Sequence, residues 1–195
     1  EQRADQCMRQ MASQRLSIDA RRIRAGDLST QDYEQIADEI RAIASLPLEI
    51  EKAANWTWRE IVSRMKRFRH EKGQGIVGID HAKSVNLGKT AMFAEAINEM
   101  YMRIRDGAHT TGHATFILMQ RKSESMFRND PAPIKRDGYG GDATHESMDM
   151  LLGMWRPSQV YKVKKVTAKT KAEEDKCDVK ILEWEDKAEV IMLKN

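Results

Sequence analysis

The sequence predicts an α/β fold in which a mostly parallel sheet is flanked by helices and extended by antiparallel strands towards the carboxyl terminus. Helix-like and strand-like patterns alternate up to residue 120, and strand-like patterns alone follow residue 148. Alternation is typical of parallel sheets, whereas consecutive strands pair in antiparallel fashion. Short continuous apolar runs, such as residues 76–79, indicate strands that are buried on both faces.

The first expected elements are two helices and a short strand. Residues 4–12 are predicted to be helical, and a second helix begins after a cap at Ser29 or Thr30, because isoleucines recur there at helical spacing. Pro47 ends this helix. Residues 48–51 alternate apolar and acidic side chains, as a short strand does.

A third helix leads into the first central strand. Thr57 and Glu60 have the spacing of a capping box, which predicts that a helix begins there. The apolar run 76–79 then ends on Asp80. An acid at the carboxyl end of such a strand lies where open α/β sheets bind ligands, and in nucleotide-hydrolysing folds it orients Mg²⁺. A strand followed by a turn that begins with Asp is the alternative interpretation.

The remaining elements complete the predicted sheet. A helix is expected over residues 91–105, with Gly107 as its stop, followed by a second buried strand over residues 114–120 that ends on Gln120. Residues 121–147 are rich in Gly, Pro and charge and are predicted to be a mobile loop. A terminal antiparallel meander is expected from residues 160–169, 177–184 and 190–193.

Composition limits the class of protein. The 195 residues, 41% hydrophobic and 32% charged, suit one domain, and the net charge of +3 is compatible with nucleic acid without being diagnostic of it. Cys7 and Cys177 are too far apart in the sequence for a zinc motif, so a reduced cytoplasmic protein is expected. No apolar run is long enough to span a membrane and no signal peptide is visible.

Two further motifs each have a plain alternative. Gly88, Lys89 and Thr90 match the end of a phosphate-binding P-loop, but Lys83 stands where that motif has its first glycine, so a simple helix entry is the alternative. His109 and His113 have a metal-ligand spacing on a helix, but nearby glycines favour a surface loop and no third ligand is evident.

A run of basic side chains in the third helix has two interpretations. It meets phosphate groups, or it is a solvated helix face, which is the more common case. Its members are Arg64, Lys66, Arg67, Arg69, His70 and Lys72.

The order of several short motifs resembles the carboxyl-terminal ATPase domain of DnaB-family replicative DNA helicases. The family has an S-L-E-M glutamate, an R-[TS]-G-x-L segment, a strand I-V-I-D-Y-L-Q, a strand ending in S-Q, an E-Q-D-A-D segment and an A-K-Q-R-N-G segment. The matching residues here are Glu1, Arg24–Leu28, Ile76–Lys83, Leu118–Gln120, Glu146–Leu152 and Ala168–Glu173. The resemblance covers nearly the whole chain in order. It implies one RecA-like domain over residues 1–195 that lacks its amino-terminal P-loop portion, because the chain starts inside the first motif.

The resemblance implies an ATP-dependent helicase that uses ATP and Mg²⁺ bound between subunits. Glu1 would be the general base, Asp80 would organise Mg²⁺ through water, and Gln120 would sense the γ-phosphate. Lys169 and Lys171 would reach the nucleotide of the neighbouring subunit. Arg9 and Gln10 correspond to the adenine-binding position of the family.

The resemblance also implies partners. Single-stranded DNA would pass through a hexameric ring, and a helicase loader and a primase would bind the protein. Basic side chains and one flexible turn are the candidates for contact with the DNA backbone, which is sequence-independent and salt-sensitive. These candidates are Lys83, Lys89, Arg121, Lys122, Lys135, Arg136, Tyr139 and Gly140.

Departures from the family pattern leave other functions open. Lys171 stands where the family has a finger Arg, His81 replaces a Tyr, and residues 137–142 lack the DNA-binding Arg of the family. We therefore expect a divergent relative from a phage or prophage. A DNA- or partner-binding fragment that does not hydrolyse ATP, and a RecA-like recombinase, are the two alternatives.

Overall fold

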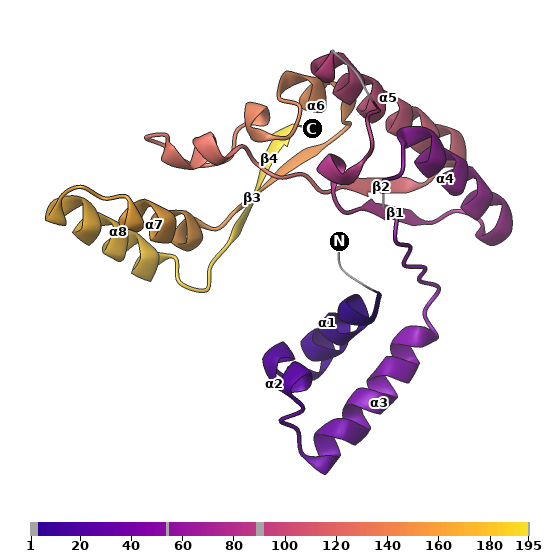
Figure 1. Ribbon diagram of the computed structural model, residues 1–195, viewed down its shortest axis with the longest axis horizontal. Helices are drawn as coiled ribbons and strands as arrows, with labels where there is room; N and C mark the ends of the chain where they lie inside the picture. The colour runs from indigo at the N-terminus through magenta and orange to yellow at the C-terminus, as the bar shows by residue number, and fades with distance from the viewer. Residues whose placement is uncertain (1–3, 54, 89–91, 195) are drawn as a thin grey trace. The chain divides into compact units, whose positions relative to one another are not determined.

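The computed structural model describes residues 4–53, 55–88 and 92–194, and contacts divide the chain into two compact units (Figure 1). Unit 1 spans Glu1–Ala54 and unit 2 spans Asn55–Asn195. Each unit is described by itself. No helix in the described ranges is long and apolar enough to cross a membrane.

Unit 1 consists of three helices, α1 (Ala4–Leu16), α2 (Ala20–Ala25) and α3 (Thr30–Ala44). α1 packs against α3, and the Arg15 guanidinium lies 2.7 Å from the Glu39 carboxylate across this contact. The predicted cap at Ser29 is confirmed, since its hydroxyl accepts from the Asp32 amide and Asp32 accepts from the Ser29 amide.

The predicted strand at residues 48–51 is wrong. These residues have no regular secondary structure and are exposed. A strand is stable only where another strand satisfies its amides and carbonyls, and none of the described segments pairs with this one.

Unit 2 begins with α4 (Trp58–Lys72), β1 (Ile76–Ile79) and the short 3₁₀ helix η1 (Ala82–Ser84), followed by α5 (Phe93–Thr111) and β2 (Ala114–Ile117). β1 and β2 are parallel, with Ile76 opposite Ala114 and Ile79 opposite Ile117. The predicted capping box of α4 is present, because Thr57 and Glu60 exchange hydrogen bonds in both directions.

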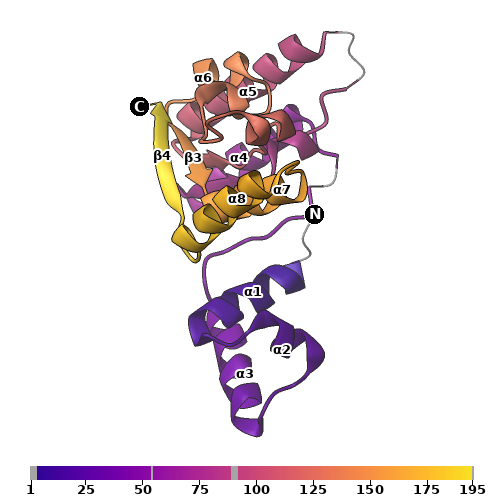
Figure 2. The same cartoon turned by 90° about the vertical axis from the view of Figure 1, so that its left-hand side faces the viewer.

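The second half of unit 2 contains a separate antiparallel pair. The remaining elements in chain order are η2 (Ser123–Phe127), η3 (Lys135–Asp137), α6 (Asp142–Ser147), β3 (Leu151–Trp155), α7 (Pro157–Val166), α8 (Lys171–Glu183) and β4 (Glu189–Lys194). β3 pairs with β4, and α7 and α8, which follow β3 and precede β4 in the chain, form a helical hairpin (Figures 1 and 2). The predicted α/β fold is therefore confirmed, with a parallel pair covered by helices and a separate antiparallel pair.

Two of the three strands of the predicted meander are wrong. Residues 160–169 lie largely in α7 and residues 177–184 lie in α8, whereas residues 190–193 do form a strand. Helix start signals decided the outcome: Pro157 occupies the first turn of α7, and Thr170 and Glu173 form a capping box at the start of α8.

The core of unit 2 lies between α4, α5 and one face of the parallel pair. Its buried members are Ile61, Met65, Ala82, Val85, Ile97, Met100, Tyr101 and Ile104. Val77, Ile79 and Ile117 pack against this cluster, whereas Ile76 and Phe116 on the other face are 74% and 60% exposed. The prediction that both strands are buried on both faces is therefore wrong for the described chain, in which α4 and α5 cover a single face.

Gly107 does not end its helix, contrary to the prediction. α5 continues to Thr111 and ends at Gly112, which adopts φ 71°. Gly107 is instead buried against α4, where an added Cβ would lie 2.9 Å from the Cγ2 atom of Val62. The missing side chain allows the two helices to pack closely.

We expect Gly107→Ala to lower the free energy of unfolding by about 1 kcal/mol. Overpacking against a stiff β-branched side chain costs roughly 1–3 kcal/mol, and the better helix propensity of Ala returns about 1 kcal/mol. Urea unfolding of both forms measures the difference. The matched control is the same substitution in a Val62→Ala background, where it becomes neutral or stabilising; an equal loss in both backgrounds would contradict the proposed contact.

Candidate functional site

The structure brings two of the predicted site residues, Asp80 and Gln120, to the same edge of the parallel pair. Asp80 directly follows β1 and Gln120 lies shortly after β2. Backbone hydrogen bonds continue beyond the strands: the Leu118 amide donates to the Ile79 carbonyl at 3.0 Å, and the Ala82 amide donates to the Leu118 carbonyl at 2.8 Å. Both side chains are exposed at this carboxyl edge, where α/β sheets bind ligands.

The turn after Asp80 is held by contacts with the core and exposes one candidate cation. Ala82 and Val85 are buried in the core, whereas Lys83 between them is exposed. The Asn86 amide donates to the Trp56 carbonyl at 2.8 Å, which ties the turn to the start of α4. Glu1, Lys89 and Thr90 lie outside the described residues, so only Gly88 of the Gly88–Thr90 motif is described.

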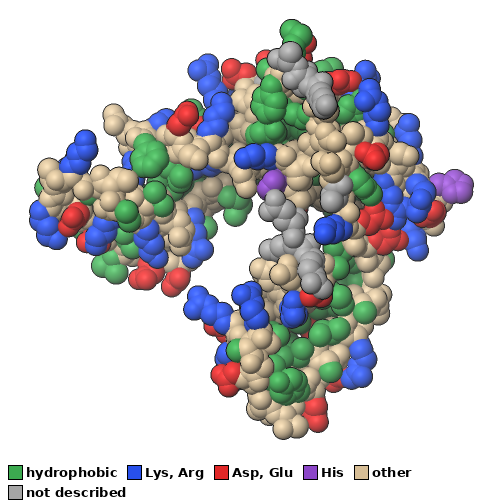
Figure 3. Space-filling model, in the orientation of Figure 1, with side chains coloured by type: hydrophobic (Ala, Val, Ile, Leu, Met, Phe, Trp, Pro, Cys, Tyr) green, Lys and Arg blue, Asp and Glu red, His purple; other side chains and the backbone are tan. Residues whose placement is uncertain are grey.

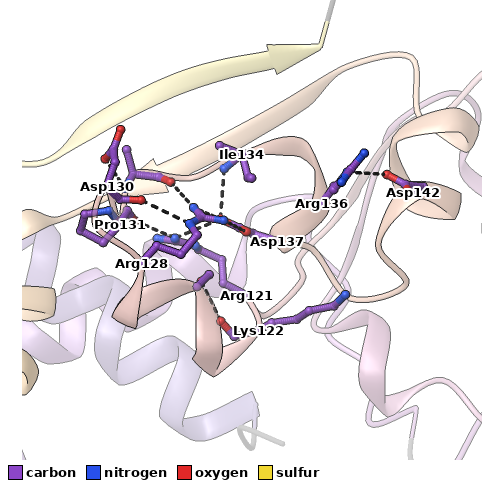
Figure 4. Close-up of polar contacts among 11 residues, drawn as sticks. Arg121, Lys122, Arg128, Asp130, Pro131, Ile134, Arg136, Asp137 and Asp142 are labelled. Atoms are coloured by element: carbon purple, nitrogen blue, oxygen red, sulfur yellow. Dashed lines mark hydrogen bonds and ion pairs between the residues drawn. The ribbon is translucent and has the colours of Figure 1, made fainter.

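Three side chains form a partly buried ion-pair cluster in the segment that follows Gln120, which we call the clasp: Arg121, Arg128 and Asp137 (Figure 4). The Asp137 side chain is only 6% exposed. It accepts from Arg128 Nη1 at 2.6 Å and Nη2 at 2.9 Å, and from Arg121 Nη2 at 3.1 Å. The Ile134 amide donates a further bond to it at 3.1 Å.

In the clasp Arg121 has a structural role, whereas the sequence predicted an exposed side chain that contacts DNA. Its guanidinium also donates to the Pro131 carbonyl at 2.8 Å and lies 5.8 Å from the ring centroid of Trp155. The predicted mobile loop is thus organised by η2, η3, α6 and the clasp. Sequence reasoning missed Arg128 and Asp137, because nothing local distinguishes them from solvated loop charges.

The pKa of Asp137 is set by two opposed effects. Burial raises the pKa, but hydrogen bonds from Arg128 and the Ile134 amide, together with the charges of Arg128 and Arg121, outweigh it and hold the pKa below the ordinary value of 3.8. Asp137 is therefore ionised in the folded protein at neutral pH.

We expect the stabilising contribution of the clasp to disappear in acid. Because the folded-state pKa is lowered, this contribution is fully present above the unfolded-state pKa and is lost as the pH falls through the folded-state pKa. The difference in melting temperature between the wild type and Asp137→Asn should therefore be constant down to about pH 5 and shrink as the pH falls below about 4. A difference that is independent of pH would contradict the ionised state assigned to Asp137.

Three exposed cations flank the clasp, and we call them the cationic loop: Lys122, Lys135 and Arg136. Lys122 and Arg136 extend to the same side, away from the clasp (Figure 4). Arg136 lies 3.5 Å from the Asp142 carboxylate, with both side chains largely exposed. Within the described ranges Lys122 and Lys135 form no ion pair.

Tyr139 and Gly140 follow the cationic loop and are anchored to the core. The buried Tyr101 hydroxyl donates to the Tyr139 carbonyl at 2.9 Å, and the Phe93 and Tyr139 rings meet edge to face. Burial raises the pKa of the Tyr139 hydroxyl. Gly140 adopts φ 96°, a conformation that favours glycine.

Lys169 and Lys171 lie at the turn between α7 and α8, which projects away from α4, α5 and the parallel pair (Figure 1). Lys171 contacts Asp175 and Glu174 on its own helix, at 3.3 Å and 3.4 Å, and hydrogen bonds to these two carboxylates raise its pKa. The side chain is 78% exposed. On the face seen in Figure 3, Lys and Arg side chains gather over this hairpin.

The candidates for adenine binding lie in unit 1. Arg9 and Gln10 are exposed on α1, and the Arg9 guanidinium donates to the Asp5 carboxylate at 2.8 Å.

The two histidines do not form a metal site. His113 is buried, and its Nδ1 accepts from the Gly75 amide while its Nε2 lies 3.0 Å from the Met65 carbonyl oxygen. His109 lies in α5, near the Asp149 carboxylate. Among the described residues there is no group of three His, Cys, Asp or Glu side chains that could hold a metal.

The basic side chains of α4 are partly neutralised within the helix. The Arg64 and Arg67 guanidiniums lie 3.6 Å and 3.2 Å from the Glu71 carboxylate. Lys66, Arg69 and His70 are exposed, which favours the solvated-face interpretation.

Comparison with known families decides the assignment that the edge geometry indicates. The model of the DnaB-like helicase C terminal domain matches residues 1–195. This chain belongs to that family.

Individual relatives are distant in sequence and close in fold. The chain is 22% identical over 136 residues to the replicative DNA helicase DnaB of Mycobacterium intracellulare, covering 69% of this chain and 24% of the relative. A solved DnaB-like replicative helicase, described with its interactions with primase, superposes with a TM-score of 0.81 at 18% identity, covering 100% of this chain and 43% of that one. A second solved structure, an ATPase domain, superposes with a TM-score of 0.82 at 17% identity, covering 100% of this chain and 64% of that one. The chain thus spans less than two thirds of the length of each of these relatives.

Proposed function

We propose that this chain is the motor of an ATP-dependent replicative DNA helicase, in which hydrolysis between subunits drives translocation on single-stranded DNA. The observation that carries this proposal is the pairing of Asp80 and Gln120 at one carboxyl edge in a chain of the DnaB-like family. We further propose that units 1 and 2 are parts of one ATPase domain spanning residues 1–195. In this proposal six copies form a ring in the cytoplasm, with a loader and a primase as partners.

The groups at the carboxyl edge fit ATP and Mg²⁺ chemically. Mg²⁺ prefers oxygen ligands and keeps several waters, and the exposed Asp80 carboxylate can hold a hydrated ion by accepting from those waters. When bound, the ion neutralises charge that develops on the phosphates. The side-chain amide of Gln120, at the same edge as Asp80, can donate to a phosphate oxygen. When that phosphate leaves, the lost contact can change the position of Arg121, the next residue in the chain. Glu1 is proposed as the general base, and Arg9 and Gln10 as contacts to the adenine.

Lys169 and Lys171 are proposed to act on the nucleotide of the neighbouring subunit. Their turn projects away from the parallel pair of their own chain, which suits action in trans (Figure 1). The raised pKa of Lys171 keeps it fully charged at neutral pH. A cation at this position stabilises charge on the transferred phosphoryl group, although Lys lacks the bidentate fork of Arg.

The proposed contact with DNA uses the loops at the carboxyl edge. The exposed Lys83 and the cationic loop are placed to meet backbone phosphates, and Tyr139 and Gly140 lie in the same segment. Lys89 is a further proposed contact. Such binding is independent of sequence, because phosphates carry no base information.

The test is ATP hydrolysis by the full-length polypeptide with and without single-stranded DNA, together with unwinding of a forked duplex. We expect hydrolysis that DNA stimulates and unwinding that requires ATP. Absence of both activities would overturn the proposal. Strand exchange without unwinding would favour a RecA-like recombinase instead.

One observation favours a second candidate, a DNA- or partner-binding module that does not hydrolyse ATP. Lys171 is engaged by Glu174 and Asp175 of its own helix, so it must leave these carboxylates before it can act in trans. Binding of single-stranded DNA without any hydrolysis, by the full-length polypeptide, would support this candidate.

A further inference from the structure

The clasp joins three segments that are separate in the sequence. Arg121 follows Gln120 in the segment after β2, Asp137 ends η3, and Arg128 lies between them, directly after η2. The Lys122 amide also donates to the Asp137 carbonyl at 2.9 Å, so both the side chain and the backbone of Asp137 hold the segment that contains Arg121 and Lys122. The clasp therefore ties this segment to η3.

Arg128 closes the loop and connects it to α7. Its Nη2 donates to the Ala132 carbonyl at 2.6 Å, and its Nε donates to the Asp130 carbonyl at 3.2 Å. Its own carbonyl accepts from Lys164 Nζ at 2.8 Å, and Lys164 lies in α7. The loop is thus held by a forked guanidinium whose three nitrogens each donate to an acceptor in the loop (Figure 4).

The clasp fixes the backbone on which the cationic loop stands. Lys122 is the residue after Arg121, and Lys135 and Arg136 occupy the 3₁₀ turn that Asp137 closes. The Asp137 carboxylate caps this turn by accepting from the Ile134 amide. Without the carboxylate, of these contacts only the hydrogen bond from the Lys122 amide to the Asp137 carbonyl would still join the two ends of the cationic loop.

We propose that Asp137 and Arg128 are positioning residues, which hold Lys122, Lys135 and Arg136 in the arrangement that binds the phosphates of a single-stranded polynucleotide. This inference rests on the proposed function and deepens it by assigning roles to two residues that touch no DNA. The clasp converts three separate surface cations into one preformed binding element, which lowers the ordering cost of binding.

General electrostatic attraction and positioning by the clasp predict opposite changes in DNA affinity for Asp137→Asn. This substitution removes a negative charge beside the cationic loop, so general electrostatic attraction alone would tighten DNA binding. If the clasp positions the loop, the affinity instead falls, by about tenfold, because the cations no longer converge on one strand. The sign of the change separates the two explanations.

The experiment is a titration of labelled oligo(dT) with the full-length protein at several salt concentrations. For single strands the slope of log affinity against log salt falls by about 0.7 for each phosphate that the protein no longer neutralises. Lys135→Ala should reduce the magnitude of the slope by about 0.7. Asp137→Asn should reduce it by about two to three times as much, although this variant removes none of the three cations. Tighter binding by Asp137→Asn, or an unchanged slope, would overturn the proposal.

Three further variants keep the outcome decisive. Arg128→Lys keeps the charge and loses the fork, and we expect a smaller loss of affinity in the same direction. If both clasp variants unfold, the network serves overall stability and the proposal fails. If Lys122→Ala, Lys135→Ala and Arg136→Ala all bind oligo(dT) like the wild type, then the assigned DNA contact itself is wrong, which is a failure of the proposed function rather than of the clasp.

Discussion

Asp80→Asn should reduce DNA-stimulated ATP hydrolysis of the full-length protein by about 10- to 100-fold, the usual effect of removing a group that orients a metal through its waters. The carboxylate is exposed at the end of β1 beside the Gln120 segment, so the change removes a negative charge and leaves the core untouched. Binding of single-stranded DNA should persist, because the cationic loop is separate from Asp80. The measurement is steady-state phosphate release at saturating ATP, paired with DNA binding by each variant.

A matched control comes from the same unit. Asp106→Asn changes an exposed carboxylate on α5 that has no proposed role at the edge. It should leave hydrolysis within about twofold of the wild type, since isolated surface charges contribute little. If Asp80→Asn also kept full DNA-stimulated hydrolysis, then Asp80 would be an ordinary turn residue and the assignment of the edge would fail.

The features that the sequence predicted correctly are those that depend on local signals. The cap at Ser29 and the box of Thr57 and Glu60 each require only a few adjacent residues. The parallel pairing of β1 and β2 required one further rule, that strands alternating with helices form parallel sheets. These predictions do not depend on the tertiary contacts between helices and strands.

The errors concern features that distant residues decide. Whether Gly107 ends a helix or lies at a helix crossing depends on Val62, which belongs to another helix. Likewise, nearby glycines favoured a surface loop for His113, but its side chain is buried and its two ring nitrogens contact the Gly75 amide and the Met65 carbonyl. A local pattern cannot reveal such partners.

The error at the α7–α8 hairpin has a different source, because the sequence there contains both helix signals and strand signals. Alternating Val and Lys around residue 163 indicated a strand, while Pro157 and the Thr170–Glu173 box indicated helix starts. Caps are specific in position, whereas β-propensity depends on pairing, so the helix signals should have taken precedence. The clasp carried no comparable signal, since Arg128 and Asp137 become informative only when the loop closes.

Tyr101→Ala should cost about 3–5 kcal/mol of unfolding free energy, in line with the removal of a large buried ring. The side chain is fully buried at the centre of the core, among Ile97, Met100 and Ile104, and its hydroxyl donates to the Tyr139 carbonyl at 2.9 Å. Truncation therefore leaves a cavity and removes the hydrogen bond to the Tyr139 carbonyl at once. Thermal unfolding followed by circular dichroism should show a decrease in melting temperature on the order of 10 °C.

Tyr101→Phe separates the two components of this loss. The ring keeps its volume, so the core should lose only about 1 kcal/mol, while the Tyr139 carbonyl loses its donor. Because Tyr139 and Gly140 follow the cationic loop, amide exchange at Gly140 and Gly141 should accelerate in Tyr101→Phe, with little change in global stability. Unchanged exchange there would show that the clasp alone orders the segment, and that the hydroxyl of Tyr101 contributes to the core and not to the loop.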